Sequence, residues 1–237
     1  GACRYGAGGW EAATIRCLPT GTVQVLTGST PHGQGHETSW SQIVADTLGY
    51  GVDEVEVLHG DTAVVPLGMD TYGSRSLAVG GVALYYAAER IAEKAKKIAA
   101  HLLGVDEAQV DHVRGTFHGP ESSLTLKEVA FAAWTAHNLP AGMEPGLEAT
   151  YVYDPPNFSW PFGSHIGVVE IDEETGAVEV LKYVAGDDCG NQINPTILEG
   201  EVDGGVHQGL APAVVEGAGL AADGTPPPAH PPHHPAP

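Results

Sequence analysis

The sequence predicts an α+β protein made of two similar halves, each consisting of a β-hairpin, a loop and a helix. The first observation behind this prediction is that short segments of alternating apolar and polar residues, typical of half-buried strands, are interleaved with longer segments of helical periodicity. The second is that the segment TGTVQVL, residues 20–26, returns as TGAVEVL, residues 175–181. The same pattern is also simply a good hairpin sequence, so an internal repeat and a coincidence both stay open.

The first half begins with a hairpin whose strands, residues 13–18 and 22–26, flank the turn Pro19-Thr20-Gly21. A helix from Glu37 to Leu48 follows, and helical spacing predicts a buried stripe of Trp40, Ile43, Val44, Thr47 and Leu48. The other elements predicted in this half are a strand at 55–58, a helix from about 79 to 103, a strand–turn unit within 105–126 and a helix at 126–137.

The second half begins after an irregular, proline-bearing segment at 139–164. Strands at 166–171 and 178–184 lead into a loop at 186–195 and a helix at about 197–210. We therefore expect one domain over residues 1–217, with halves of about 8–150 and 151–217, and a disordered tail rich in Pro and His at 218–237. Because the chain starts without Met and ends in this tail, we expect the domain to be truncated at both ends.

Charge and cysteine content exclude several classes of function. The formal net charge is −20 with only ten Lys and Arg, which argues against nucleic acid and anionic membranes as partners. An anionic ligand would have to be held mainly by backbone N–H groups and helix N-termini. Three scattered cysteines without a CxxC pair, and the absence of a long apolar run from the sequence, predict a soluble, cytoplasmic protein.

Three glycine-bearing loops, each between a strand and a helix, are the candidate binding elements. The first is Pro31-His-Gly-Gln-Gly-His36, whose two histidines also suggest a metal site or a zinc hydrolase. The glycines between them oppose a helix, and no third ligand or base can be placed, so a ligand-facing backbone is the favoured interpretation.

The second loop, Tyr72-Gly-Ser-Arg-Ser76, offers a cation, hydroxyls and backbone donors ahead of a long helix, which suits an anion; an ordinary N-cap at Ser76 is the equal alternative. The third loop contains Asp187-Asp-Cys-Gly190 and Asn194. Because the neighbouring carboxylates would raise a thiol pKa, we expect Cys189 to be a buried packing residue and Asn194 to be a hydrogen-bonding amide.

Five segments carry a resemblance to a known family: GGWEAATIR, PHGQGHETSWSQIVADTLG, VEVLHGDTAVVPLGMDTYGSRSLAVGG, EPGLEATYVYDPPNFSWPFGSHIGVVEID and DDCGNQINPTILEGEVDGGVHQG. They span about residues 8–210 in order. Together they resemble the large, molybdopterin-binding subunit of the molybdenum hydroxylases, which include xanthine dehydrogenase, aldehyde oxidase and aerobic carbon monoxide dehydrogenase. The resemblance is to the second molybdenum-cofactor-binding domain of these subunits. The amino-acid sequences of the motifs favour the carbon monoxide dehydrogenase-like branch.

The resemblance implies a set of cofactor-binding residues, one group on each loop. Those residues are Gln34, Gly35 and His36 toward the pterin, Gly73, Ser74, Arg75 and Ser76 toward the pyrophosphate or dinucleotide, and Cys189, Asn194 and Gln208 on the third side. It implies no protein ligand for the metal, because molybdenum in this family is held by the pterin dithiolene. It further implies the cytosine dinucleotide form of molybdopterin, and iron–sulfur clusters and FAD on partner subunits or domains.

Two departures from the family pattern bear on function. The substrate-facing loop and the base glutamate of the family are absent from this chain, so we expect no catalytic residue here; Glu201 also replaces a usual Gln. The predicted function is therefore the cofactor-binding segment of a hetero-oligomeric enzyme that oxidises carbon monoxide, an aldehyde or an N-heterocycle with oxygen from water. A non-catalytic acidic binding module, or an inactive remnant of such an enzyme, is the alternative.

Overall fold

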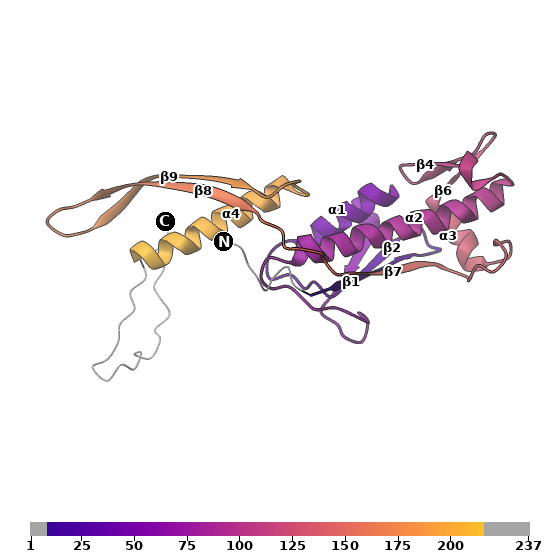
Figure 1. Ribbon diagram of the computed structural model, residues 1–237, viewed down its shortest axis with the longest axis horizontal. Helices are drawn as coiled ribbons and strands as arrows, with labels where there is room; N and C mark the ends of the chain where they lie inside the picture. Colours follow the sequence, from indigo (N-terminus) through magenta and orange to yellow (C-terminus); the bar gives the residue numbers. More distant parts are fainter. Residues whose placement is uncertain (1–8, 216–237) are drawn as a thin grey trace. The chain divides into compact units, whose positions relative to one another are not determined.

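The computed structural model describes residues 9–215, and the predicted tail at 218–237 lies outside this range. The chain divides into two compact units, of which the first ends at Pro161 and the second begins at Phe162 (Figure 1). The mixed helix and strand content confirms the predicted α+β class. The predicted boundary at 150/151 differs from the observed division, because it falls inside a strand of the first unit.

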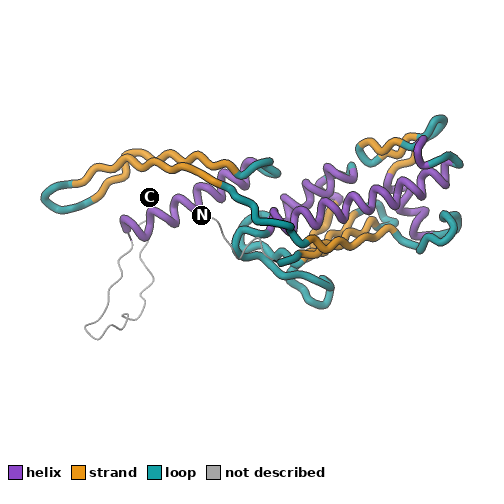
Figure 2. The backbone as a smooth tube through the Cα atoms, viewed as in Figure 1, coloured by secondary structure: helices purple, strands orange, loops and turns teal. Residues whose placement is uncertain are grey.

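The first unit is built on a four-stranded sheet, whose strands are orange beside the purple helices in Figure 2. The strand order is β3-β2-β1-β7. Its strands are β1 (Glu11–Cys17), β2 (Val23–Thr27), β3 (Val55–Leu58) and β7 (Leu147–Tyr153). β1 runs antiparallel to both β2 and β7, whereas β2 and β3 are parallel. The hairpin turn predicted between β1 and β2 is confirmed, with Gly21 at φ +88° and a hydrogen bond from the Leu18 amide to the Thr22 carbonyl.

β7 corrects the prediction that residues 139–164 are irregular. Its sequence, LEATYVY, alternates in the manner of a strand, and it pairs with β1 from Cys17↔Leu147 to Glu11↔Tyr153. Leu147 is fully buried, and Tyr151 and Tyr153 pack against the core from the same side. The prolines that follow in the sequence obscured this alternation.

The described part of the first unit contains three α-helices. They are α1 (His36–Leu48), α2 (Val82–Leu103) and α3 (Leu126–Thr135). A π-helical turn, η2 (Ser76–Gly81), precedes α2, so the helical segment begins three residues before the predicted start at 79. α1 and α2 both end at glycines in the left-handed region, Gly49 at φ +75° and Gly104 at φ +69°, where a residue without Cβ is unstrained. α3 ends at Thr135, earlier than predicted.

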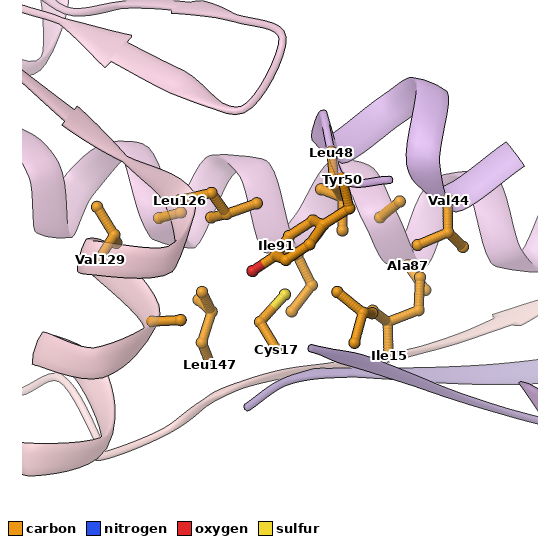
Figure 3. Packing of buried hydrophobic residues seen from close by; sticks show 14 of the residues in the cluster. Ile15, Cys17, Val44, Leu48, Tyr50, Ala87, Ile91, Leu126, Val129 and Leu147 are labelled. Atoms are coloured by element: carbon orange, nitrogen blue, oxygen red, sulfur yellow. The ribbon is translucent and has the colours of Figure 1, made fainter. Parts of the chain in front are cut away.

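The hydrophobic core lies between the sheet and the helices, which cover one of its faces (Figure 1). Figure 3 shows Ile15 and Cys17 of β1 beneath Ala87 and Ile91 of α2, with Leu48 of α1 above them. Alanines at the buried positions of α2 let this helix lie close to the strands. Burial of each large aliphatic side chain in this core contributes about 1.5–3 kcal/mol.

A small satellite sheet completes the first unit. It has the order β4-β5-β6, and its strands are β4 (Asp111–Val113), β5 (Thr116–His118) and β6 (Ser123–Thr125). Two short 3₁₀ turns, η1 (Val52–Glu54) and η3 (Glu107–Gln109), lie before β3 and β4. The satellite sheet matches the strand–turn unit predicted within 105–126, and its Phe117 is buried in the main core.

Within residues 162–215, the second unit contains one hairpin and one α-helix. β8 (Phe162–Ile171) and β9 (Val178–Asp188) pair antiparallel, with a bulge at Val168/Val169, and α4 (Pro195–Leu210) is followed by the π turn η4 (Ala211–Val215). Both predicted strands are confirmed, and each extends beyond its predicted range. No residue whose side chain the structure describes in this unit is buried. The order hairpin, loop, helix occurs in both units, while a common origin for the halves stays a prediction.

Candidate functional site

The first predicted loop presents open backbone at the start of α1. Gly33 and Gly35 both have positive φ, +109° and +66°, which favours glycine at these positions. Gly35 is the N-cap of α1 and supplies no side-chain cap to the first-turn amides. A Cβ on Gly33 would meet nothing within 4 Å, so the backbone at this position is accessible. A helix N-terminus of this kind can receive an anion.

The two histidines of this loop have different surroundings. His32 is exposed, whereas His36 is buried, stacks on Trp40 with ring centroids 4.9 Å apart, and lies 3.4 Å through Nδ1 from the Ser29 carbonyl oxygen. Within residues 9–215, no three His, Cys, Asp or Glu side chains form a group that could hold a metal ion. The described part of the chain therefore offers nothing in favour of the zinc hydrolase hypothesis.

A hydrogen bond joins two side chains at the first turn of α1. Glu37 Oε1 is 2.8 Å from His59 Nε2. The pKa of Glu37 is lowered, first by its own backbone N–H and then by the hydrogen bond with His59. The hydrogen bond with His59 therefore favours the ionised form of Glu37, and that negative charge counts against an anion at this helix N-terminus.

The second predicted loop is a tightly turned segment leading into η2. Asp70, Gly73 and Ser74 all have positive φ, at +78°, +59° and +62°. The left-handed region is unfavourable for Asp and Ser by about 1 kcal/mol or more each, so the surrounding structure must impose it. Ser76 Oγ donates to Thr71 Oγ1 at 2.9 Å instead of capping the helix, which shows that the N-cap interpretation of Ser76 was wrong.

Arg75 requires a correction, because its guanidinium is not offered to a ligand. The side chain is fully buried and forms a 2.9 Å ion pair with Glu11, which is fully buried as well. Arg75 also donates to the backbone carbonyls of Asp70 and Trp10. Glu11 was not predicted from the sequence as part of the site. It lies at the start of a strand among apolar residues, where a carboxylate is normally interpreted as facing solvent.

The first and second loops are joined at their bases. The Thr30 amide donates to Asp70 Oδ1 at 3.2 Å, and a Cβ built on Gly80 would lie 2.4 Å from Ser29 Oγ. The structure therefore brings two of the three predicted loops together within the first unit. Residues 28–30 and 67–70, where the two loops meet, were not among the predicted cofactor-binding residues.

The residues predicted on the third loop lie in the second unit. Cys189 is exposed, which corrects the expectation of a buried packing residue. It follows β9 directly, in a unit without buried side chains among its described residues. The Asn194 side chain caps α4 by accepting a hydrogen bond from the Ile197 amide at 3.0 Å. Gln208 is exposed on α4, and the roles of these three residues toward a cofactor rest on the resemblance alone.

A hollow of about 530 Å³ in the second unit is a poor candidate for an anion site. Three of its lining residues are carboxylates, Asp187, Glu199 and Asp203, and Cys189, Asn194 and Gln208 do not line it. Negative charge of this density would repel a phosphate-bearing ligand.

In the described range, no helix combines the length and apolarity that crossing a membrane requires.

Comparison with known proteins gives the family. The sequence model of the molybdopterin cofactor-binding domain family matches residues 2–230 of this chain. The carbon monoxide dehydrogenase large chain of Hydrogenophaga pseudoflava is 45% identical over 210 residues, covering 88% of this chain and 26% of that protein. The nicotine 6-hydroxylase large subunit of Paenarthrobacter nicotinovorans is 36% identical, covering 87% and 26%.

Solved structures agree with this assignment. Reconstituted carbon monoxide dehydrogenase from Oligotropha carboxidovorans has a TM-score of 0.87 and 39% identity, covering 93% of this chain and 29% of that chain. Quinoline 2-oxidoreductase from Pseudomonas putida 86 has a TM-score of 0.83 and 34% identity, covering 92% and 28%. The chain thus spans between a quarter and a third of the length of these relatives. It belongs to the molybdopterin cofactor-binding domain family, as the resemblance to molybdenum hydroxylases predicted.

Proposed function

We propose that this chain is the cofactor-binding part of a molybdenum hydroxylase large subunit, and that the amides of residues 33–36 and 73–76 bind molybdopterin in its cytosine dinucleotide form. One observation carries the proposal. Two glycine-bearing loops that precede helical segments are joined at their bases through Thr30 and Asp70 within one unit. Two such loops can present several N–H donors to one extended anionic ligand.

The residues present fit a phosphate-bearing pterin. The chain carries a net charge of −20, so binding by neutral amides and a helix N-terminus suits it better than binding by a cluster of side-chain cations. Gly33 leaves open backbone, and the partly buried Gln34 adds a side-chain amide at the start of α1. His36 would act from its buried position by fixing the start of the helix against Trp40.

The bound cofactor would supply the redox chemistry, since molybdenum can accept two electrons from a substrate that is oxidised with oxygen from water. This chain's part is to bind and orient the cofactor. We propose carbon monoxide, an aldehyde or an N-heterocycle as substrate, with the carbon monoxide dehydrogenase-like branch favoured by the identities of 45% and 42% to two carbon monoxide dehydrogenase large chains. Partner subunits with iron–sulfur clusters and FAD would receive the electrons.

The experiment that tests this function uses the full-length chain that contains these residues, purified with its complex. Molybdenum per protein and the cytosine nucleotide released by acid are measured for the wild type, Gln34→Ala and Gln24→Ala. Gln24 is a matched control, because it lies on β2 and its side chain is committed to Glu56 at 2.8 Å. Loss of hydrogen bonds to the cofactor at Gln34 should lower occupancy about fivefold or more, whereas Gln24→Ala should not.

Two results would contradict the proposal. If the wild-type complex contains neither molybdenum nor a pterin nucleotide, the chain is a non-catalytic binding module or a remnant of such an enzyme. If the wild type is loaded and Gln34→Ala retains full occupancy, the Gln34 side-chain amide does not contribute to the binding surface, contrary to the role proposed for it.

A further inference from the structure

Glu11 and Arg75 form a fully enclosed ion pair within the loop region of the first unit. Both side chains have no exposed surface, and Arg75 Nη1 lies 2.9 Å from Glu11 Oε2. The two residues are distant in sequence, at the start of β1 and at the end of the second loop. A buried ion pair adds little to stability compared with apolar side chains of similar volume, so stability alone does not explain this one.

The contacts of the pair extend to both ends of the second loop. Both oxygens of the Glu11 carboxylate accept from the Met69 amide at 3.2 Å, and Oε1 also accepts from the Ala12 amide. Arg75 donates to the Asp70 carbonyl and, at 2.7 Å, to the Trp10 carbonyl. The pair therefore fastens the beginning of β1 to the segments before and after the left-handed residues of the loop.

Three glycines enclose the Glu11 carboxylate. A Cβ on Gly28 would lie 2.7 Å from Glu11 Oε1, and a Cβ on Gly68 would lie 3.1 Å from the same atom. A Cβ on Gly80 would lie 3.5 Å from Glu11 Cγ. The Glu11 side chain thus packs closely against the backbone at the base of the first loop, in the segment that leads to the second loop and in η2. Charge-assisted hydrogen bonds in such an enclosed place hold their partners in one geometry.

We propose that Glu11 and Arg75 are a positioning pair for the cofactor: they hold Asp70, Gly73 and Ser74 in left-handed conformations so that the amides of residues 73–76 face the ligand. The proposal rests on the proposed function. Neither side chain touches the cofactor, because neither has exposed surface. The role assigned to Arg75 is therefore indirect, through the loop whose ends it fastens.

The test uses the full-length chain in its complex and three variants. Glu11→Gln keeps the shape and removes the carboxylate charge. Arg75→Lys keeps the positive charge but replaces the planar guanidinium, which donates from two separate nitrogens, by a single ammonium nitrogen. The double variant Glu11→Gln with Arg75→Met removes both charges, which avoids leaving an uncompensated buried charge if a single variant fails to fold. Glu148→Gln is the matched control, because Glu148 forms a partly exposed pair with Arg16 on the same β1.

Three quantities are measured for each protein: the thermal unfolding midpoint, amide hydrogen exchange of residues 67–76 and of α2, and bound molybdenum. In the double variant and in Arg75→Lys we expect exchange in the loop to rise about tenfold or more with that of α2 unchanged. Molybdenum occupancy is expected to fall about fivefold or more. The Glu148→Gln control is expected to match the wild type in exchange and occupancy.

Two outcomes would overturn the positioning role. One is unchanged exchange of the loop in a folded double variant, and the other is faster exchange with full molybdenum occupancy. Both leave the proposed function standing if Gln34→Ala still lowers occupancy, because the two loops are tested by separate variants. Failure of the proposed function is recognised differently, by a wild-type complex without molybdenum or pterin.

Discussion

The backbones of Gly28 and Gly68 cross in direct contact: a Cβ built on Gly28 would lie 2.3 Å from the Gly68 Cα, and the reverse distance is also 2.3 Å. Gly28 follows β2 directly, and Gly68 lies in the segment that leads to the second loop. The two loops can approach each other at their bases only because neither residue has a side chain. This crossing makes glycine a packing requirement at both positions.

Gly28→Ala is expected to lower the free energy of unfolding by about 1–3 kcal/mol, because the methyl group would overlap backbone on the facing loop. Chemical denaturation of the purified protein measures this change. Gly200→Ala in α4 is the control, since a Cβ there meets nothing within 4 Å. That substitution should be neutral or raise stability by up to about 1 kcal/mol through helix propensity. A Gly28→Ala protein as stable as the control would show that the crossing is not tight.

Cys17 is expected to react slowly with alkylating reagents even at alkaline pH. Burial raises the pKa of its thiol from 9.0 to about 12, and the thiolate is the reactive form. Iodoacetamide labelling followed by peptide mapping should modify Cys17 about a hundredfold more slowly than the exposed Cys189 at pH 8. Equal labelling rates in the folded protein would contradict the buried position of Cys17 between β1 and Tyr50 (Figure 3).

Because the pKa of the Cys17 thiol is raised, the free energy of unfolding is expected to fall at alkaline pH. The raised pKa means that the unfolded chain releases the proton first, so the contribution is complete below pH 9 and is lost as the pH rises toward 12. Burial also raises the pKa of Tyr50, so this residue adds a further decrease in the free energy of unfolding above pH 10. Urea denaturation between pH 8 and 11 should show a shallower decline for Cys17→Ala than for the wild type. If stability declines with pH equally in the two proteins, Cys17 is not a source of the alkaline loss of stability.

The N-terminus of α3 depends on Thr125 and Glu128, which form a capping box. Thr125→Ala should lower the free energy of unfolding by about 1 kcal/mol, whereas Thr125→Ser should retain most of it. The pKa of Glu128 is lowered, first by the Thr125 amide and then by its hydroxyl. The contribution of Glu128 is therefore present above pH 4.5 and lost as the pH falls below it. Denaturation curves at pH 7 and pH 4 for both variants test this, and an unchanged Thr125→Ala protein would contradict the cap.

The distribution of buried residues predicts unequal folding of the two units. All described buried residues lie before Phe162, so a polypeptide of residues 9–161 is expected to unfold cooperatively. A polypeptide of residues 162–215 leaves Phe162, Ile166 and Val184 exposed and is not expected to fold alone. Circular dichroism during thermal unfolding distinguishes the two. A cooperative transition in the second polypeptide would show that its hairpin and helix have a core of their own.

Local signals in the sequence predicted most of the secondary structure. Alternation predicted the β1–β2 hairpin and β3, and helical spacing predicted α1, of whose stripe Trp40, Val44 and Leu48 are buried. β7 was missed although LEATYVY alternates, because the neighbouring prolines dominated the interpretation of that region. The order of the strands could not be predicted, since it depends on a pairing between segments more than a hundred residues apart.

The candidate site was predictable in part. The glycines at 33, 35 and 73 indicated the loops correctly, because left-handed backbone leaves a direct mark on residue type. The commitment of Arg75 to Glu11 leaves no such mark, since a cation in a polar loop reads as a ligand-binding group until its partner is known. The same holds for Cys189, whose exposure depends on packing and not on its neighbours in sequence.

The place of β1 in the sheet also bears on how the chain folds during synthesis. One edge of β1 meets β2 after a short turn, while the other edge meets β7, whose last partner is Tyr153. A ribosome must therefore release residues up to 153 before this second edge can be satisfied, and until then the strand has unpaired amides and carbonyls. Closing so long a segment of chain is slow. The nascent hairpin would be most vulnerable to aggregation in that interval.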